Sequence, residues 1–289
     1  MKENVPILGV PIHPVRLEEL RGLFGAYVVE QKQHIIATVN PEFIIEAQKN
    51  QPFKKILTST DLNVADGIGI LWAAKYLKLA IDTSRIRTRV DRVRYRKAIS
   101  VWQCVYSLLA IVFYPRFVRD VIPERISGMD ILEQLIGLTS TGDYSMYLLG
   151  GKKGVAAAAK IELEKKFPQA VITGAKSGYL RKGEKEGSFV EAVNKAKPDI
   201  LIVAFGSPRQ EQWIWSNLKN MGSVKIAVGV GGVLDYVSRK KMRAPRWMQS
   251  FGLEWLFRLL YEPGRFPRIK NATWVFVRSI VDLKSRGWV

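Results

Sequence analysis

The chain has 289 residues, 47% of them hydrophobic, so it can bury a sizeable core and general disorder is excluded. Its 45 Lys and Arg residues against 26 Asp and Glu give a formal net charge of +19, which points to an anionic partner such as nucleic acid, acidic lipid or a phosphate-bearing substrate. The single cysteine, Cys104, excludes an intrachain disulfide and agrees with a reducing cytoplasm, and the N-terminus lacks the apolar core of a signal peptide.

The N-terminal part of the chain alternates strand and helix patterns. Residues Ile7 to Val10 form a short strand candidate, and Arg16 to Glu30 have the apolar spacing of an amphipathic helix. The β-rich run His34 to Val39 predicts a second strand that stops at Asn40-Pro41, after which Glu42 to Asn50 have helical character. A strand, a polar strand end and a helix therefore follow one another.

The stretch from Leu62 to Trp72 is the strongest candidate for a functional centre. It reads as an apolar strand ending on Asp66, two nearby glycines and an apolar helix start. An α/β sheet binds its ligands at the carboxyl ends of its strands, where Thr38 and Asn40 are also expected. Asp66 is therefore the candidate for the group that performs the chemistry. The alternative is that Asp66 only caps the helix that follows.

A basic segment followed by an apolar segment interrupts this pattern between about residues 80 and 122. Arg85 to Lys97 contain seven basic residues and one acid, Asp91, and Ile99 to Tyr114 are almost entirely apolar. The apolar run falls short of the ~20 residues that span a bilayer. The composition favours a segment that lies in a membrane interface or dips partly into it. The alternative is a helical hairpin packed on the protein or on a second subunit.

The chain from Pro123 to Val237 returns to alternating helices and strands, which predicts a mainly parallel sheet covered by helices on both faces. A glycine turn at Gly150 to Gly154 between a strand and a helix is of the kind that offers backbone N–H groups to a phosphate. Neither the dinucleotide fingerprint G-x-G-x-x-G nor a Walker motif occurs. Strands are expected at Tyr144 to Leu149, Ala170 to Thr173, Asp199 to Phe205 and Ile226 to Val230, and helices at Met129 to Leu138, Val155 to Phe167 and Phe189 to Ala196.

The C-terminal part is rich in Arg, Trp and Phe. From Arg239 to Arg286 there are twelve basic residues against three acids, with one amphipathic helix ending at Pro263-Gly264 and another at Trp274 to Leu283. Such an array suits a diphosphate at a membrane surface, although single-stranded nucleic acid would need similar residues. For any one arginine, a solvated surface charge is an equally good explanation. The expected organisation is a catalytic α/β domain over residues 1–245 and a helical appendage over 246–289.

Five blocks resemble the WecG/TagA/CpsF family of bacterial glycosyltransferases, and together they cover nearly the whole chain except about residues 80 to 122. They occur in the family's order, which is far more specific than any single block. The blocks are NPE at 40–42, VADGIG at 64–69, PERISGMD at 123–130, GSPRQEQW at 206–213, and RAPRW with EWLFRLLYEPGRFPR at 243–268.

The resemblance implies the GT-E fold and an inverting transferase that needs no metal or other cofactor. It implies a UDP-sugar donor, typically UDP-N-acetylmannosamine or its uronic acid, and an acceptor of N-acetylglucosamine on undecaprenyl diphosphate, for teichoic acid, enterobacterial common antigen, capsule or exopolysaccharide synthesis. The enzyme would be cytoplasmic and peripheral on the inner face of an anionic plasma membrane. The resemblance assigns Asp66 as base, Thr38 and Asn40 beside it, Arg125 and Gln210 to the active-site lining, Asp235 to the nucleotide, and Arg258, Arg265 and Arg268 to closure over the diphosphate.

The residues themselves fit such a reaction. A carboxylate can take the proton of an attacking hydroxyl, and arginines can neutralise the leaving diphosphate in a chain that has no Asp-x-Asp pair. The segment of about residues 80–122 is longer than the family pattern suggests, which favours an added membrane-contacting hairpin and leaves a homo-oligomer contact as the alternative. A second function class is a non-catalytic basic scaffold that binds nucleic acid. Electrophoretic mobility shifts across salt concentrations would detect such binding. Nucleic acid is not the expected partner.

Overall fold

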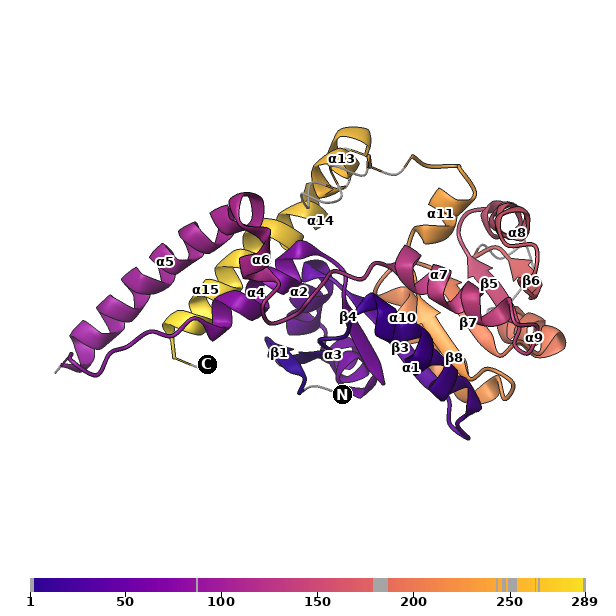
Figure 1. The fold of residues 1–289 in the computed structure, drawn as a ribbon, viewed down its shortest axis with the longest axis horizontal. Coiled ribbons are helices and arrows are strands. Elements are labelled where there is room, and N and C mark those ends of the chain that lie inside the picture. The colour runs from indigo at the N-terminus through magenta and orange to yellow at the C-terminus, as the bar shows by residue number, and fades with distance from the viewer. Residues whose placement is uncertain are drawn as a thin grey trace.

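The sheet has six parallel strands. A computed structural model describes residues 3–86, 88–178, 187–242, 244–245, 248, 254–262, 264 and 266–287, with Arg258 described by its backbone alone. The strand order is β4-β3-β8-β7-β5-β6, and all neighbouring pairs run parallel (Figure 1). The predicted α/β architecture is therefore confirmed. The strands are β3 (His34–Val39), β4 (Leu62–Ala65), β5 (Met146–Gly150), β6 (Ile172–Lys176), β7 (Ile200–Ala204) and β8 (Ile226–Gly229).

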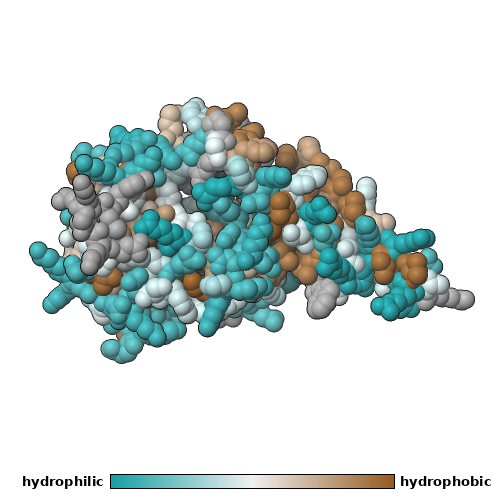
Figure 2. Space-filling model, turned by 180° about the vertical axis from the view of Figure 1, so that it is seen from behind, coloured by the Kyte–Doolittle hydropathy of each residue, from teal (hydrophilic) through white to brown (hydrophobic). Residues whose placement is uncertain are grey.

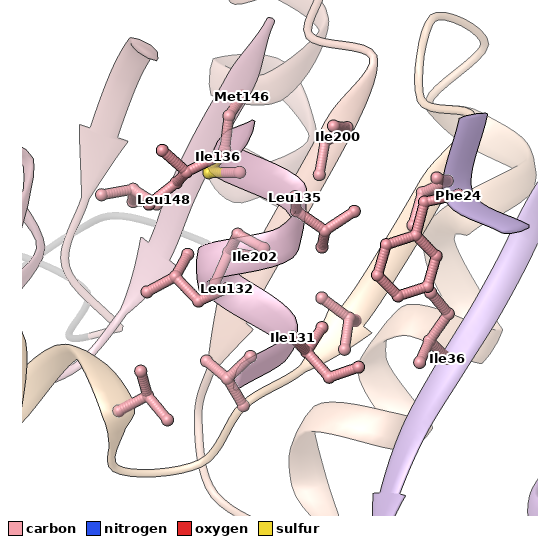
Figure 3. Close-up of a cluster of buried hydrophobic side chains, with 14 of the residues drawn as sticks. Phe24, Ile36, Ile131, Leu132, Leu135, Ile136, Met146, Leu148, Ile200 and Ile202 are labelled. Atoms are coloured by element: carbon pink, nitrogen blue, oxygen red, sulfur yellow. The ribbon is translucent and has the colours of Figure 1, made fainter. Parts of the chain in front are cut away.

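Helices cover both faces of the sheet because alternate side chains of each strand point to opposite faces. Ile36 of β3 joins one apolar cluster, whereas its neighbours Ile35 and Ala37 join clusters on the other face. Figure 3 shows the first cluster, in which Phe24 and Ile131 meet strand residues. The first face carries α1 (Leu17–Val29), α7 (Gly128–Thr139), α8 (Val155–Lys166) and α11 (Val233–Val237), and the second carries α2 (Pro41–Lys49), α3 (Gln51–Ser59), α4 (Ile68–Lys78), α9 (Gly187–Ala196), α10 (Arg209–Asn217) and the 3-10 turn η1 (Leu218–Asn220).

The N-terminus forms a hairpin, so the strand expected at Ile7 to Val10 is wrong. Strands β1 (Val5–Ile7) and β2 (Val10–Ile12) pair antiparallel. Leu8 and Gly9 form the turn between them, and both have left-handed φ angles, 49° and 81°. A two-residue turn of this hand fits the twist of a hairpin, and it falls in the middle of the apolar run that suggested one strand.

Two further boundaries differ from the sequence prediction. A separate helix, α3, follows α2 directly, because the side chain of Asn50 accepts a hydrogen bond from the N–H of Phe53 and starts a new helix. Strand β6 begins and ends later than expected, and Gly174 lies inside it rather than after it. A Cβ atom at Gly174 would come within 2.6 Å of a ring carbon of Tyr147, so the neighbouring strand requires glycine there.

The segment of about residues 80–122 contains one long helix, α5 (Arg89–Phe113), and a short one, α6 (Pro115–Val118), rather than the expected hairpin. Helix α5 projects from the body of the molecule as an arm (Figure 1). The chain ends in α13 (Glu254–Tyr261), α14 (Phe266–Lys270), the π-helical turn η3 (Asn271–Val275) and α15 (Phe276–Ser285). Helix α15 packs against α4 and α5, where Phe276 and Ile280 are buried.

Candidate functional site

A cavity of about 840 Å³ opens at the carboxyl edge of the sheet. Parallel strands present all their carboxyl ends at one edge, so loops that are distant in the sequence meet there. The C-terminal segment adds Glu254, Glu262, Gly264 and Arg268 to the walls. Each strand contributes a residue that follows it, namely Asn40 after β3, Asp66 after β4, Gly151 after β5, Gly178 after β6, Phe205 after β7 and Val230 after β8.

Asp66 lies half-buried in the cavity wall, directly after β4. Its backbone N–H donates a hydrogen bond to the carbonyl oxygen of Val39 at 2.8 Å, which continues the β3–β4 ladder by one residue. Gly67, not Asp66, occupies the N-cap position of α4. The alternative that Asp66 serves as the helix cap is therefore wrong, and Asp66 lines the cavity.

Thr38 and Asn40 stand on the neighbouring strand end. The register pairs Val39 with Ala65, so Asn40 and Asp66 follow at adjacent positions of the two strands. The Asn40 Oδ1 atom accepts from the N–H of Phe43 at 3.1 Å and caps α2, which leaves its amide NH2 as the donor it can offer the cavity. The Thr38 hydroxyl is buried and donates to the carbonyl oxygen of Gly229 at 3.2 Å. Thr38 thus ties β3 to β8 and Asn40 caps α2, while both residues line the cavity.

Gln210 joins two loops of the cavity wall. Its Oε1 atom accepts hydrogen bonds from the N–H groups of Gly206, at 3.2 Å, and Gly231, at 3.0 Å. Its Nε2 atom donates to Oε1 of Glu211 at 2.6 Å. The side chain is buried although it lines the cavity. Gln210 therefore fixes the loops after β7 and β8 relative to each other.

Glu211 is a buried acid that the sequence prediction missed. Burial raises the pKa of its carboxyl group to about 7, although hydrogen bonds from Gln210 and Ser207 act in the opposite direction. Its Oε2 atom has no hydrogen-bond partner among the described residues. A Cβ atom at Gly229 would lie 2.5 Å from Nε2 of Gln210 and 2.7 Å from Oε1 of Glu211, so β8 approaches this pair closely. The sequence block GSPRQEQW contains Glu211 directly after Gln210 and could have indicated it. That Glu211 is buried could be seen only in the fold.

Among the described residues, three ion pairs hold the C-terminal segment over the cavity. Their nitrogen–oxygen distances range from 2.6 to 3.3 Å and each joins side chains that are at least partly exposed. Such pairs contribute little individually in water, but they orient the segment. The pairs are Arg125 with Glu254, Lys241 with Glu262, and Arg268 with Glu42.

The other site residues predicted from the sequence have different positions. Asp235 lies in the first turn of α11 and lines the cavity. Arg125 is not among the residues that line the cavity, and reaches it through its partner Glu254. Arg258 lies on α13, but its side chain is outside the described part of the chain, as is the whole of Arg265.

Additional cations line the cavity that the sequence did not single out. They are Lys152, Arg209 and Lys241, and the guanidinium of Arg209 lies 5.0 Å from the centre of the Phe205 ring. The glycine turn after β5 contributes Gly151 and Lys152, but the N–H of Gly151 is already bonded to the carbonyl oxygen of Ala204 at 2.9 Å. Within the described ranges, no three His, Cys, Asp or Glu side chains are grouped so that they could hold a metal ion.

Comparisons with known proteins identify the family of the chain. An N-acetylglucosaminyldiphosphoundecaprenol N-acetyl-beta-D-mannosaminyltransferase from Bacillus subtilis (strain 168) is 26% identical over 243 residues, which is 84% of this chain and 77% of that protein. A protein of the same name from Staphylococcus aureus (strain MRSA252) is 23% identical over 285 residues, or 98% of this chain and 94% of that protein. The model of the Glycosyl transferase WecG/TagA/CpsF family matches residues 5–93 and 94–287. The chain therefore belongs to this family of glycosyltransferases.

Proposed function

We propose that the protein transfers a sugar, N-acetylmannosamine or a related hexose or uronic acid, from a UDP-sugar to N-acetylglucosamine on a polyprenyl diphosphate at the cytoplasmic face of the membrane. The transfer inverts the anomeric configuration and needs no metal. One observation carries the proposal: Asp66 lies with Thr38, Asn40 and Gln210 in one cavity that cationic side chains also line. The relatives from Bacillus subtilis and Staphylococcus aureus are named for an acceptor and a transferred sugar of this kind.

Asp66 is the general base in this mechanism. The acceptor hydroxyl loses its proton to the Asp66 carboxylate as its oxygen forms a bond to the anomeric carbon. The bond between that carbon and the diphosphate oxygen breaks on the opposite face, and UDP leaves with the electron pair. Asn40 supports this arrangement, because its amide NH2 is a donor on the adjacent strand end.

Cationic side chains neutralise the charge that develops on the leaving diphosphate. Arg268, Lys241, Lys152 and Arg209 line the cavity, and fixed positive charge in a partly enclosed site stabilises such a leaving group. The absence of an Asp-x-Asp pair from the sequence supports a mechanism without a metal. Arg258 and Arg265 lie close in sequence to Arg268, and we assign them to the same diphosphate.

The test is UDP release from a panel of UDP-sugars, with and without a GlcNAc-diphospho-lipid analogue, in the presence of EDTA. We expect release that requires acceptor, survives EDTA and falls at least about 100-fold in Asp66→Asn, the loss typical of removing a general base. The variant should still bind UDP, because the substitution preserves the shape of the side chain. Release that EDTA abolishes, or an Asp66→Asn variant with wild-type turnover, would contradict the mechanism.

A further inference from the structure

Helix α5 turns several polar side chains towards the protein, together with Cys104, Leu108 and Ile111, and turns large apolar side chains towards solvent. Over its last four turns, the buried residues are Ser100, Gln103, Cys104 and Ser107. On the opposite side Trp102, Leu109 and Phe113 are 64%, 54% and 80% exposed. A surface helix in contact with water has the reverse pattern. We call the outward residues the α5 stripe: Val101, Trp102, Val105, Leu109, Val112 and Phe113.

Specific hydrogen bonds fix this orientation. The indole Nε1 of Trp72 donates to the Ser107 hydroxyl at 2.9 Å. The Tyr76 hydroxyl donates to the carbonyl oxygen of Ser100 at 2.9 Å, and Nε2 of Gln103 donates to the carbonyl oxygen of Ala80 at the same distance. Rotating the α5 stripe inwards would break these bonds among buried groups, which is costly. These hydrogen bonds therefore fix the rotation of α5 that leaves its apolar face exposed.

The N-terminal part of α5 is basic. Residues 89–97 contain four Arg and one Lys against Asp91, and most of these side chains are exposed. This part forms the outer end of the arm in Figure 1. Figure 2 shows apolar atoms along the same arm, next to hydrophilic atoms at its tip. One helix thus presents an apolar stripe and a cluster of positive charge.

We propose that α5 lies on an anionic membrane surface, with the α5 stripe among the acyl chains and the basic residues 89–97 on lipid phosphates. An apolar helix face next to Lys and Arg is the pattern of an interfacial helix. Each basic residue near such a surface adds to the attraction. The inference rests on the proposed function only in assuming a lipid-linked acceptor. It adds the surface of the protein that brings the cavity to that acceptor.

The helix lies along the surface instead of crossing it. By length and composition, α5 is the one helix in the described part of the chain that could cross a membrane. However, its apolar part, residues 98–113, is only about 24 Å long at 1.5 Å per residue, less than the ~30 Å of a bilayer core. Its inner face is also occupied by α4 and α15. Only one face is available to lipid.

Charge argues against a second copy of the chain as the occupant. A parallel pair of α5 helices would oppose two clusters of Arg and Lys at residues 89–97. An antiparallel pair would place each basic part against the partner's α5 stripe. Both arrangements leave charge uncompensated, whereas an anionic lipid surface accommodates both parts of the helix together.

The experiment is co-sedimentation of the full chain with vesicles of phosphatidylcholine and phosphatidylglycerol, compared with pure phosphatidylcholine. The stripe variant is Trp102→Glu/Leu109→Glu/Phe113→Glu. The matched control is Trp215→Glu/Ile161→Glu/Val29→Glu, which places the same charges on exposed apolar side chains elsewhere. A charge variant, Arg89→Gln/Arg94→Gln/Lys97→Gln, keeps Arg92, whose Nε donates to the carbonyl oxygen of Ile86.

We expect the stripe variant to lose at least about tenfold in vesicle affinity and the control to bind as the wild type does. The charge variant should lose binding to anionic vesicles and bind neutral vesicles unchanged. A stripe variant that binds as well as the wild type overturns the proposal. One further combination of results also overturns it: the wild type sediments as a dimer without lipid, whereas the stripe variant is a monomer and binds vesicles unchanged. In that case a second copy of the chain covers the α5 stripe.

A second measurement does not depend on the folding of the stripe variant. Brominated acyl chains should quench Trp fluorescence of the vesicle-bound wild type, and the quenching should fall in Trp102→Phe; equal quenching in the two proteins overturns the proposal. The stripe variant should also keep wild-type UDP release with a soluble acceptor. Failure of UDP release in the wild type with normal vesicle binding would refute the proposed function and leave the membrane contact standing.

Discussion

Arg268 of α14 donates a hydrogen bond from Nε to Oε1 of Glu42 in α2 at 2.6 Å, across 226 positions of sequence. The bond ties the C-terminal segment to the helix that Asn40 caps. It also places a guanidinium in the wall of the cavity. The pair allows two roles of Arg268, holding the segment and binding a phosphate, to be separated by experiment.

Arg268→Ala should reduce kcat/KM for the UDP-sugar about 100-fold, because it removes a cation from the leaving group. Glu42→Ala removes the same ion pair but leaves the cation, so its loss should stay within about threefold. Steady-state kinetics of both variants at saturating acceptor provide the comparison. Equal losses would mean that Arg268 acts only through Glu42.

Gln210→Leu should lower the free energy of unfolding by about 1–3 kcal/mol, because the N–H groups of Gly206 and Gly231 lose their shared acceptor. Urea denaturation measures this change. Gln212→Leu, the same substitution two residues along α10, should change stability by less than about 0.5 kcal/mol. Similar losses in the two variants would show that the two loop contacts contribute nothing specific.

Glu211→Gln should remove a pH dependence of stability. The folded-state pKa of about 7 lies above the ordinary value of 4.5, so between these pH values the folded protein keeps a proton that the unfolded chain has released. The contribution of this group is thus fully present at low pH and is lost as the pH rises to about 7. The variant should gain about 2 kcal/mol relative to the wild type between pH 5 and pH 8.

Urea unfolding at several pH values across this range measures that difference. The amide of Gln can still accept the hydrogen bond from Gln210, so the comparison isolates the titration. Parallel stability curves for the two proteins would place the Glu211 carboxyl in contact with water in solution.

Ser107→Ala should destabilise the protein by about 1–2 kcal/mol, because the buried indole N–H of Trp72 loses its acceptor. Thermal unfolding followed by fluorescence measures the effect. Ser279→Ala on α15 is the control, since that hydroxyl donates to the carbonyl oxygen of Val275, the residue that precedes α15, and it should be nearly neutral. A neutral Ser107→Ala would show that the indole finds another partner.

Local patterns predicted the sheet because its strands are short and apolar. The strand His34–Val39 was predicted with its observed boundaries, since all six residues are buried and Asn40-Pro41 stops it. The strand ends then predicted that Thr38, Asn40 and Asp66 would lie close together, and they line one cavity. Parallel strands make this inference possible without any knowledge of their order.

Contacts across long stretches of sequence were beyond the reach of such patterns. The pairing of Arg125 with Glu254 joins residues 129 positions apart, and nothing near either residue indicates the other. The second role of Gln210 was also hidden: the resemblance assigns it to the active-site lining and it lines the cavity, but its bonds to two loops needed the fold. Which side chains of α5 face the protein could be seen only in the fold. The contact of α5 with lipid stays a prediction.

Helix α15 packs on a helix that is made much earlier in the chain. Phe276 of α15 packs against Trp72 of α4, with ring centres 6.4 Å apart, and Ile280 is also fully buried. Part of the apolar surface of α4 is therefore covered by residues that come much later in the sequence. On the ribosome, a nascent chain stopped before α15 would expose that surface, so the core around α4 can close only after residues 276–285 have been made.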